Sequence, residues 1–397
     1  MTFQHPSEEF VYRLCHRSFL SLWSYPNPLH PNRRRELCDV LVVCIPHVVL
    51  FSVKAAALGE NSKLAQTRWL RKVVDESANQ LYGAERALLR LKRVISSDGT
   101  EGVPLPEQAT VHRVTVGIGG KGAVSLPSGD FGKGFVHVLD ESVFWVILHE
   151  LDTITDFVDY LSAKEQLYSA GHRIVCEREQ DLLAVYVDQG RKFPDERPEI
   201  ITVVPGSWEQ LIANPAYQRR VTADASSRAW DDIIEYLIKE NLEPPAELTD
   251  PTKGGEKALR AMARERRFHR RLLTDTLRDF LDLAGQRKVR ARSCVSPSGV
   301  RYVFFNAPAD VDRDLRQAEL SMRCFVARSL APEAQVVVGI GTNRQPAALG
   351  YATDVVYLEI PEWTAEHQAQ AEVFKRELDL FASPIESSWQ VDEYPPE

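Results

Sequence analysis

Residues 36–55 read ELCDVLVVCIPHVVLFSVKA, and this stretch decides the fold. It contains two apolar runs rich in β-branched residues, 36–44 and 48–55, separated by a short break that includes Pro46. Runs of this length and composition are typical of β-strands, and so short a connection joins antiparallel neighbours. The stretch therefore predicts a β-hairpin in the core of the protein.

Two charged residues interrupt this apolar hairpin. Asp39 stands in the first run, and Lys54 stands close to Phe51 and Val53 in the second. A charge in a buried strand costs free energy unless it is paired or bound. Because side chains alternate along a strand, Ser52 and Lys54 share a face, and the hairpin can place Asp39 on that face too. A carboxylate, a hydroxyl and an ammonium group at one place suit a hard cation such as Mg²⁺ and an attacking water held by the lysine.

Helical and strand patterns on both sides extend the hairpin into a larger α/β core. A helix is predicted before it, with Ser7 as N-cap and Glu8 and Glu9 in the first turn. A helical region, two strands around a glycine-rich loop, and a helix broken near Thr153 follow it. These elements are residues 63–95, 111–118, 135–139 and 142–168. The predicted order is α-β-β-α-β-β-α.

In this order and spacing, residues 5–168 resemble the PD-(D/E)XK nuclease superfamily, whose fold is called restriction-endonuclease-like. The core of that family is a helix with an acid, a strand with Asp, a strand with (Asp/Glu)-x-Lys, and a further helix. The resemblance implies that Asp39 binds metal, that Lys54 is the motif lysine, and that Glu8 or Glu9 is the helix acid. Glu8 is favoured because it extends the apolar stripe of its helix by one turn. The family also implies a Mg²⁺ (or Mn²⁺) cofactor, held by Asp39 and Glu8, and a nucleic-acid partner, DNA or RNA.

Ser52 departs from the family pattern, because it stands where the motif has Asp or Glu. A neutral hydroxyl is a poor substitute for a carboxylate ligand to Mg²⁺. Three outcomes stay open: Glu8 or Glu9 supplies the second carboxylate, the site binds metal weakly, or the domain has kept the fold and lost the reaction. Gln80, in the helix after the lysine, occupies a position from which some family members touch the substrate. A solvent-facing helix residue is the alternative for Gln80.

Three functional hypotheses follow from these residues. The first is a metal-dependent nuclease that hydrolyses nucleic-acid phosphodiester bonds in anti-phage defence, because such systems fuse a nuclease-like domain to a second, unrelated domain. The second is a catalytically inactive nuclease-like fold that acts as a nucleic-acid-binding or assembly module. The third is an Asp39–Lys54 ion pair in an unrelated α/β domain. Ser52 separates the first two, because an active site needs its second carboxylate from elsewhere.

The rest of the chain predicts a second α/β region behind a polar, proline-containing linker at residues 241–255. No internal repeat is evident. The predicted parts are a nuclease-like domain at 1–170, an α/β extension of it at 171–245, a C-terminal α/β domain at 246–390, and a disordered tail at 391–397.

An arginine-rich helix is predicted over residues 256–284. At helical spacing, four of its arginines share a face that could follow a phosphate backbone. A protein interface and pairing with the acidic surplus of the chain are equally open. The four residues are Arg260, Arg264, Arg267 and Arg271.

Composition limits the remaining function classes. The chain has 397 residues, of which 44% are apolar and 26% charged, as in ordinary globular proteins. Its formal net charge of -8 argues against a general nucleic-acid coat, which needs clustered cations. Because no apolar run approaches about 18 residues and charges occur throughout the first 20, we expect a cytoplasmic protein without membrane contact. The six scattered cysteines are expected to be reduced core residues, and a homo-oligomer or a partner protein stays possible.

Overall fold

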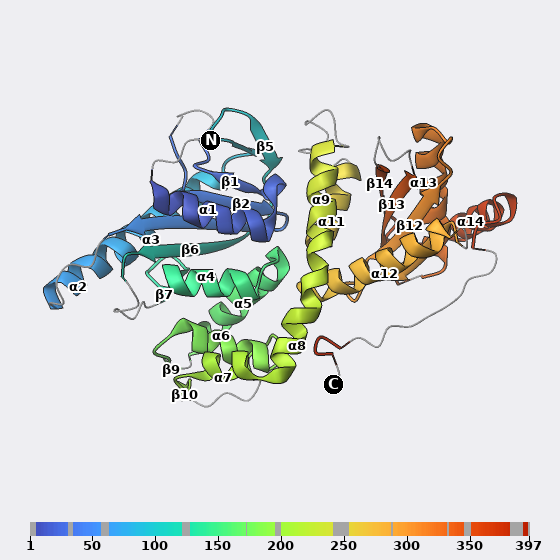
Figure 1. Ribbon diagram of the computed structural model, residues 1–397. Helices are drawn as coiled ribbons and strands as arrows, with labels where there is room; N and C mark the ends of the chain where they lie inside the picture. The colour runs from blue at the N-terminus through green and yellow to red at the C-terminus, as the bar shows by residue number, and fades with distance from the viewer. Residues whose placement is uncertain are drawn as a thin grey trace. The chain divides into compact units, whose positions relative to one another are not determined.

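The computed structural model divides the chain into two compact units, Met1–Gln218 (unit 1) and Arg219–Glu397 (unit 2). Both contain helices and sheets, so the predicted mixed α/β class is confirmed (Figure 1). The division falls inside helix α8 (Pro215–Asp224), whereas the sequence placed a linker at 241–255, of which 241–253 lie outside the described residues. The structure describes residues 5–30, 35–56, 63–120, 128–171, 173–194, 200–240, 254–286, 289–331, 333–344, 351–381 and 392–395.

Unit 1 is built on a six-stranded mixed sheet. In spatial order its strands are β1 (Ser24–Pro26), β2 (Val40–Cys44), β3 (His47–Ala55), β6 (Thr110–Ile118), β8 (Phe135–Asp140) and β7 (Gly129–Asp130). The predicted hairpin is confirmed, because β2 and β3 pair antiparallel with Val40 opposite Phe51. Strands β3, β6 and β8 then run parallel to one another. Asp39 lies one residue before β2, at the end of the hairpin where β3 finishes.

Helices cover both faces of this sheet (Figure 1). One face carries α1 (Pro6–Phe19), α4 (Glu141–Glu150) and α5 (Ile154–Ser169), and the other carries α2 (Lys63–Leu70), a π-helical turn (Arg71–Glu76) and α3 (Ser77–Leu88). Phe51 points to the first face, where its ring contacts aromatic rings of α4 and α5. The next residue, Ser52, points to the second face and contacts α3. The predicted break near Thr153 is confirmed, since Thr153 is the N-cap of α5.

Two predicted helix ends lie elsewhere in the structure. His5, and not Ser7, is the N-cap of α1: its Nδ1 accepts a hydrogen bond from the Ser7 amide at 3.3 Å, and Pro6 begins the helix. Pro is favoured at this position because its missing N–H would have no helical partner there. The helix predicted to reach residue 95 ends at Leu88, and β4 (Arg93–Ile95) follows it.

The remaining elements of unit 1 are small. Strand β4 pairs with β5 (Glu101–Pro104), and β9 (Arg173–Val175) pairs in parallel with β10 (Ile200–Thr202). Helices α6 (Glu179–Asp188) and α7 (Ser207–Ala213) complete the unit. Lys164 of α5, fully buried, donates to Glu179 at 2.6 Å and so ties α6 to the core.

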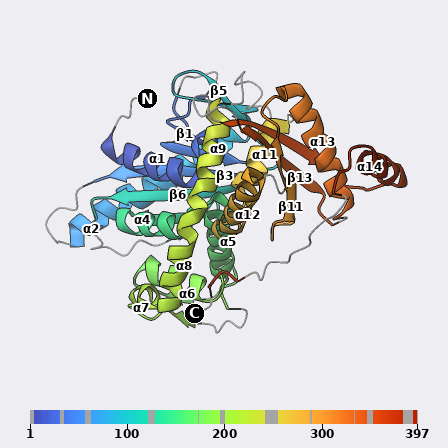
Figure 2. The same ribbon diagram turned by 45° about the vertical axis from the view of Figure 1, so that its right-hand side comes forward.

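Unit 2 contains a four-stranded sheet of β11 (Ala291–Val295), β12 (Arg301–Ala307), β13 (Val336–Arg344) and β14 (Tyr351–Glu359). Helix α13 (Arg313–Ser329) packs on this sheet, and α14 (Ala365–Glu377) lies against α13, away from the strands (Figure 2). Gly339 permits the close approach, because a Cβ atom there would lie 2.5 Å from Cys324 Sγ of α13. The unit also contains α9 (Arg228–Glu240), α11 (Gly254–Ala263) and α12 (Arg267–Gly285).

Two predictions about unit 2 need correction. The single helix predicted over 256–284 is two helices, because α11 ends at Ala263 and α12 begins at Arg267. Residues 392–395 lie in the tail that was expected to be disordered, yet the backbone carbonyls of Asp392 and Glu393 accept hydrogen bonds from Arg271. This part of the tail is therefore held in place.

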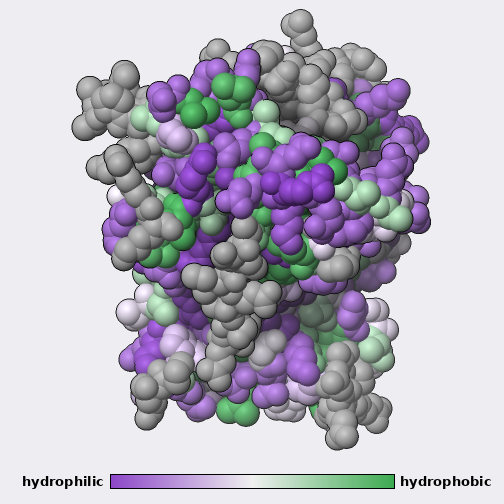
Figure 3. Space-filling model, turned by 90° about the vertical axis from the view of Figure 1, so that its right-hand side faces the viewer, coloured by the Kyte–Doolittle hydropathy of each residue, from purple (hydrophilic) through white to green (hydrophobic). Residues whose placement is uncertain are grey.

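The surface and the cysteines agree with a globular protein. On the face shown in Figure 3, hydrophilic side chains cover most of the coloured surface, and hydrophobic ones form small separate groups. Within the described residues, no helix has the length and apolar character needed to cross a membrane. All six cysteines are free thiols, as predicted. Four of them are buried, whereas Cys176 and Cys294, which were also expected in the core, are only partly buried.

Candidate functional site

Asp39 is fixed by the backbone of the strand beside it. Its amide donates to the carbonyl of Phe51 at 3.2 Å, which extends the hairpin ladder by one residue. Its carboxylate accepts a short hydrogen bond from the Val53 amide, and the residue is buried. A buried carboxylate needs such donors to remain charged. The hairpin therefore holds Asp39 at the end of β3, where the sequence predicted it.

Lys54 and Ser52 meet a side chain from helix α3 on the same face of the sheet. Lys54 Nζ donates to Gln80 Oε1 at 2.6 Å, and the Ser52 hydroxyl lies 3.2 Å from the same oxygen. Gln80 thus points toward the hairpin, so its alternative as a solvent-facing residue is wrong. Its side chain holds the Lys54 ammonium by this hydrogen bond, and the charge of Lys54 lowers the pKa of Asp39.

Ser52 does not offer a free ligand. Its side chain is fully buried between β3 and α3, where the hydroxyl lies 3.3 Å from Ser77 Oγ in addition to Gln80. Its hydroxyl is thus engaged by two side chains of α3. Ser52 therefore offers no carboxylate beside Asp39, and a second carboxylate has to come from another residue.

Glu36 is the candidate for that second carboxylate, and it was missed in the sequence. Burial, the charge of Asp39 and a hydrogen bond to Asp39 raise the pKa of Glu36 to about 7. Protonated Glu36 donates in this hydrogen bond, because the same contact favours the charged form of Asp39. Burial raises the pKa of Asp39, while the hydrogen bond from Val53 and the charge of Lys54 lower it. The pKa of each carboxyl group therefore lies above its ordinary value, and burial is the largest cause for both.

The backbone around Glu36 explains its position. Glu36 forms an isolated antiparallel bridge with Leu29, in the segment between β1 and β2. This bridge turns a residue three positions before Asp39 back toward the Asp39 carboxylate. The signal in the sequence was a second acid close to Asp39, at the edge of the apolar run.

The structure also separates the two candidate acids of helix α1. The charge of Glu8 contributes to the raised pKa of Glu36, after burial and the effects of Asp39. Glu9 instead forms an i,i+4 ion pair with Arg13 at 2.5 Å, and both side chains are exposed. Glu9 is thus engaged at the surface by Arg13, and the role of Glu8 stays a prediction.

The arginine face predicted for unit 2 does not form. Arg267 and Arg271 are buried, where they pair with Asp231 and Asp224 at 2.9 Å each. Arg260 pairs with Glu256 at 3.2 Å. Of the predicted set, only Arg264 is exposed, and it lies in the break between α11 and α12. The helix break and the acidic neighbours explain this outcome, since helical spacing holds only along one uninterrupted helix.

The chain matches no protein-family model, no curated protein and no solved structure. The chemistry of the site therefore has to follow from its own residues. A carboxyl group whose pKa is raised beside another can exchange its proton for a cation, because a divalent ion relieves the repulsion of the paired charges. Oxygen ligands of this kind suit Mg²⁺, which binds through one or two carboxylates and keeps several waters. Glu36, Asp39 and Lys54 thus form a candidate hydrolytic site.

Proposed function

We propose that this protein is a divalent-metal-dependent nuclease that hydrolyses phosphodiester bonds of nucleic acid. Glu36 and Asp39 are its metal ligands, and Lys54 is the cation beside the reacting water. The observation that carries the proposal is a buried Asp39 carboxylate held by the Val53 amide, on the same hairpin as a Lys54 ammonium held by Gln80. Glu36 supports it, because the charge of Asp39 contributes to its raised pKa. The order of helix, hairpin and helix around them agrees with the resemblance to PD-(D/E)XK nucleases.

The ligand set fits Mg²⁺ or Mn²⁺. Both side chains offer carboxylate oxygens, and Glu8 adds negative charge nearby. With two protein carboxylates, such an ion keeps waters in its other positions, and one of these waters can act as the nucleophile. When bound, the ion supplies positive charge that polarises the phosphoryl group and makes the water more acidic.

The residues of the chain divide the remaining work. Asp39 keeps a fixed orientation because the Val53 amide holds its carboxylate. Lys54 can donate a hydrogen bond to the attacking water or to a non-bridging phosphate oxygen, where it stabilises developing negative charge. Gln80 positions Lys54 from helix α3. We therefore place Gln80 in the site as a positioning residue.

A second function is a catalytically inactive nuclease-like fold that binds nucleic acid or assembles with a partner. One observation favours it: the hydroxyl of Ser52 replaces the family acid and is buried under α3. If Glu36 does not take over the role of that acid, the metal site is too weak for hydrolysis. This function predicts binding of nucleic acid without cleavage.

Cleavage of labelled single- and double-stranded DNA and RNA by the purified full-length chain separates the two functions. We expect cleavage of at least one substrate with Mg²⁺ or Mn²⁺, and none with a chelator. Asp39→Asn and Lys54→Ala should lower the rate by at least about 100-fold, while Glu9→Gln, a matched change on the neighbouring helix, should leave it unchanged. Absence of cleavage together with binding in all variants would favour the inactive module.

A further inference from the structure

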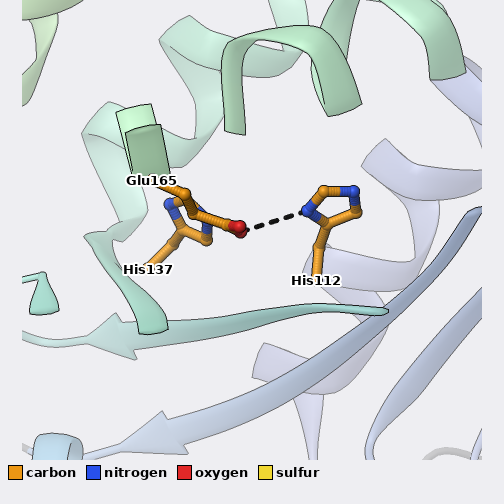
Figure 4. Close-up of side chains that lie close together, drawn as sticks. All are labelled: His112, His137 and Glu165. Atoms are coloured by element: carbon orange, nitrogen blue, oxygen red, sulfur yellow. Dashed lines mark hydrogen bonds and ion pairs between the residues drawn. The ribbon is translucent and has the colours of Figure 1, made fainter. Parts of the chain in front are cut away.

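A second group of ligand side chains lies on the opposite face of the same sheet. Glu165 of helix α5 accepts hydrogen bonds at one oxygen, Oε1, from His112 Nδ1 of β6 at 3.2 Å and from His137 Nε2 of β8 at 2.9 Å (Figure 4). One potential ligand atom from each residue lies within 4.8 Å of the other two. We call these three residues the His–Glu cluster.

The strand register separates this cluster from the Glu36–Asp39 site. His137 lies opposite Val114 of β6, and Val114 lies opposite Phe51 of β3. His112, two residues before Val114, therefore projects to the Phe51 face, beneath α5. Lys54 and Ser52 project to the other face, toward α3. A ligand of the cluster would thus bind away from the carboxyl pair.

The spacing of the three ligand atoms matches a tetrahedral ion. Bonds of about 2.0–2.1 Å to His nitrogen and carboxylate oxygen place neighbouring ligand atoms of a tetrahedron about 3.3 Å apart. Two of the three separations in the cluster are 3.2 and 2.9 Å, and the third does not exceed 4.8 Å. Small side-chain shifts would therefore bring all three atoms onto one ion.

The protonation of the cluster also suits a metal. Burial lowers the pKa of His137 to about 4, so its imidazole is neutral at pH 7. Although burial opposes it, hydrogen bonds from His112 and His137 lower the pKa of Glu165 to about 2. Metal binding would move each imidazole N–H to the far nitrogen. His112 Nε2 and His137 Nδ1 are buried without a hydrogen-bond partner among the described residues, so the bonds to the metal have to offset the cost of two buried N–H groups without acceptors.

Access to the cluster is possible from one side. Both imidazoles are almost completely buried, at 1% and 0% exposure, whereas the Glu165 side chain is 31% exposed. An ion could therefore enter beside Glu165 and keep one position open toward solvent. Three protein ligands with an open fourth position are typical of zinc sites that bind a water.

We propose that His112, His137 and Glu165 form a binding site for a transition-metal ion, Zn²⁺, separate from the Glu36–Asp39 site. Two imidazole nitrogens favour Zn²⁺ over Mg²⁺, which takes oxygen ligands. The bound ion would link β6, β8 and α5 and would present a water at the Glu165 side. The inference is independent of the proposed nuclease function.

Zinc titration of chelator-treated, full-length protein tests the proposal. We expect about one Zn²⁺ per chain, measured by competition with a chromophoric chelator and by elemental analysis. Glu165→Gln keeps the size of the side chain and removes its charge, and should weaken Zn²⁺ binding by at least about 100-fold. Asp159→Asn on the same helix and Glu36→Gln at the other site are matched controls that should keep the wild-type affinity.

Two outcomes would overturn the proposal: wild-type protein that takes up no Zn²⁺, or Glu165→Gln protein that binds it as tightly as wild type. Circular dichroism checks that the variant is folded. Cobalt substitution of the wild-type protein needs no variant, because Co²⁺ in a four-coordinate nitrogen and oxygen site absorbs strongly in the visible range. An octahedral Co²⁺ spectrum, or none, would also contradict the tetrahedral site.

Discussion

Metal binding at the Glu36–Asp39 pair should release a proton near neutral pH, and Glu36→Gln should remove that linkage. In the metal-free protein, burial and the neighbouring Asp39 raise the pKa of Glu36 to about 7. Glu36 is therefore mostly protonated below pH 7. A divalent ion needs both carboxylates charged, so this proton has to leave. The apparent affinity for Mg²⁺ should therefore depend on pH in a range where ordinary glutamates do not titrate.

The size of the effect follows from that pKa. At pH 8 most of Glu36 is deprotonated, and at pH 6 about a tenth is, so the affinity for Mg²⁺ should fall about tenfold between these values. In Glu36→Gln the fall should be absent, and the affinity at pH 8 should be at least about tenfold weaker because one ligand is lost.

Isothermal titration calorimetry measures both quantities. Titrations with Mg²⁺ in buffers of different ionisation enthalpy count the released protons, and we expect up to about one per ion at pH 6. Mg²⁺ is the suitable probe because its preference for oxygen ligands excludes the His–Glu cluster. A wild-type affinity that is constant from pH 6 to 8, or a pH dependence that survives in Glu36→Gln, would refute the reasoning.

Three further predictions concern stability and positioning. The pKa of His137 is about 4 in the folded protein, against an ordinary value of 6.5. Its contribution to the free energy of unfolding is therefore complete above pH 6.5 and falls by about 3 kcal/mol as the pH is lowered to 4. Urea unfolding should show this loss in the wild type, and an equal loss in His137→Gln would contradict the prediction. Gln80→Ala removes the acceptor of Lys54 and should slow cleavage about tenfold with unchanged Mg²⁺ affinity; equal single-turnover rates would show that Gln80 does not position the lysine. Arg267→Ala removes one of the arginine partners of buried Asp231, which keeps Arg270, and should lower the free energy of unfolding by about 1–3 kcal/mol. Exposed Arg264→Ala should lower it by less than about 0.5 kcal/mol; similar values for the two would contradict the assignment of Arg267 to the core.

The hairpin and its charged residues could be predicted because they obey a local rule. Alternation along a strand fixes which side chains share a face, and the short connection fixes the pairing. Asp39 and Lys54 therefore lie on the same hairpin as predicted, Asp39 bonded to the Val53 amide and Lys54 to Gln80. Choosing Glu8 over Glu9 followed from the same kind of rule, the periodicity of a helix.

Glu36 could not be predicted because no periodic element contains it. It lies in irregular chain before β2, and its direction depends on a bridge to Leu29 from another segment. The His–Glu cluster was missed for a related reason. His112, His137 and Glu165 come from three elements, and their convergence needs the register between β6 and β8.

The arginine face failed because helical spacing was applied across a helix end. Arg260 belongs to α11, while Arg267 and Arg271 belong to α12. Arg267 pairs with Asp231, 36 residues away in the sequence, and Arg271 pairs with Asp224, 47 residues away. Only the tertiary structure therefore shows that these two arginines are buried.

Diffraction from crystals soaked in Mn²⁺ at pH 8 tests the central claim most directly, because anomalous scattering locates the ion without reference to activity. We predict an anomalous peak about 2.2 Å from carboxylate oxygens of both Glu36 and Asp39, close to the Lys54 ammonium. Absence of a peak there at saturating Mn²⁺, with Glu36 still hydrogen-bonded to Asp39, would contradict the metal site and with it the proposed nuclease.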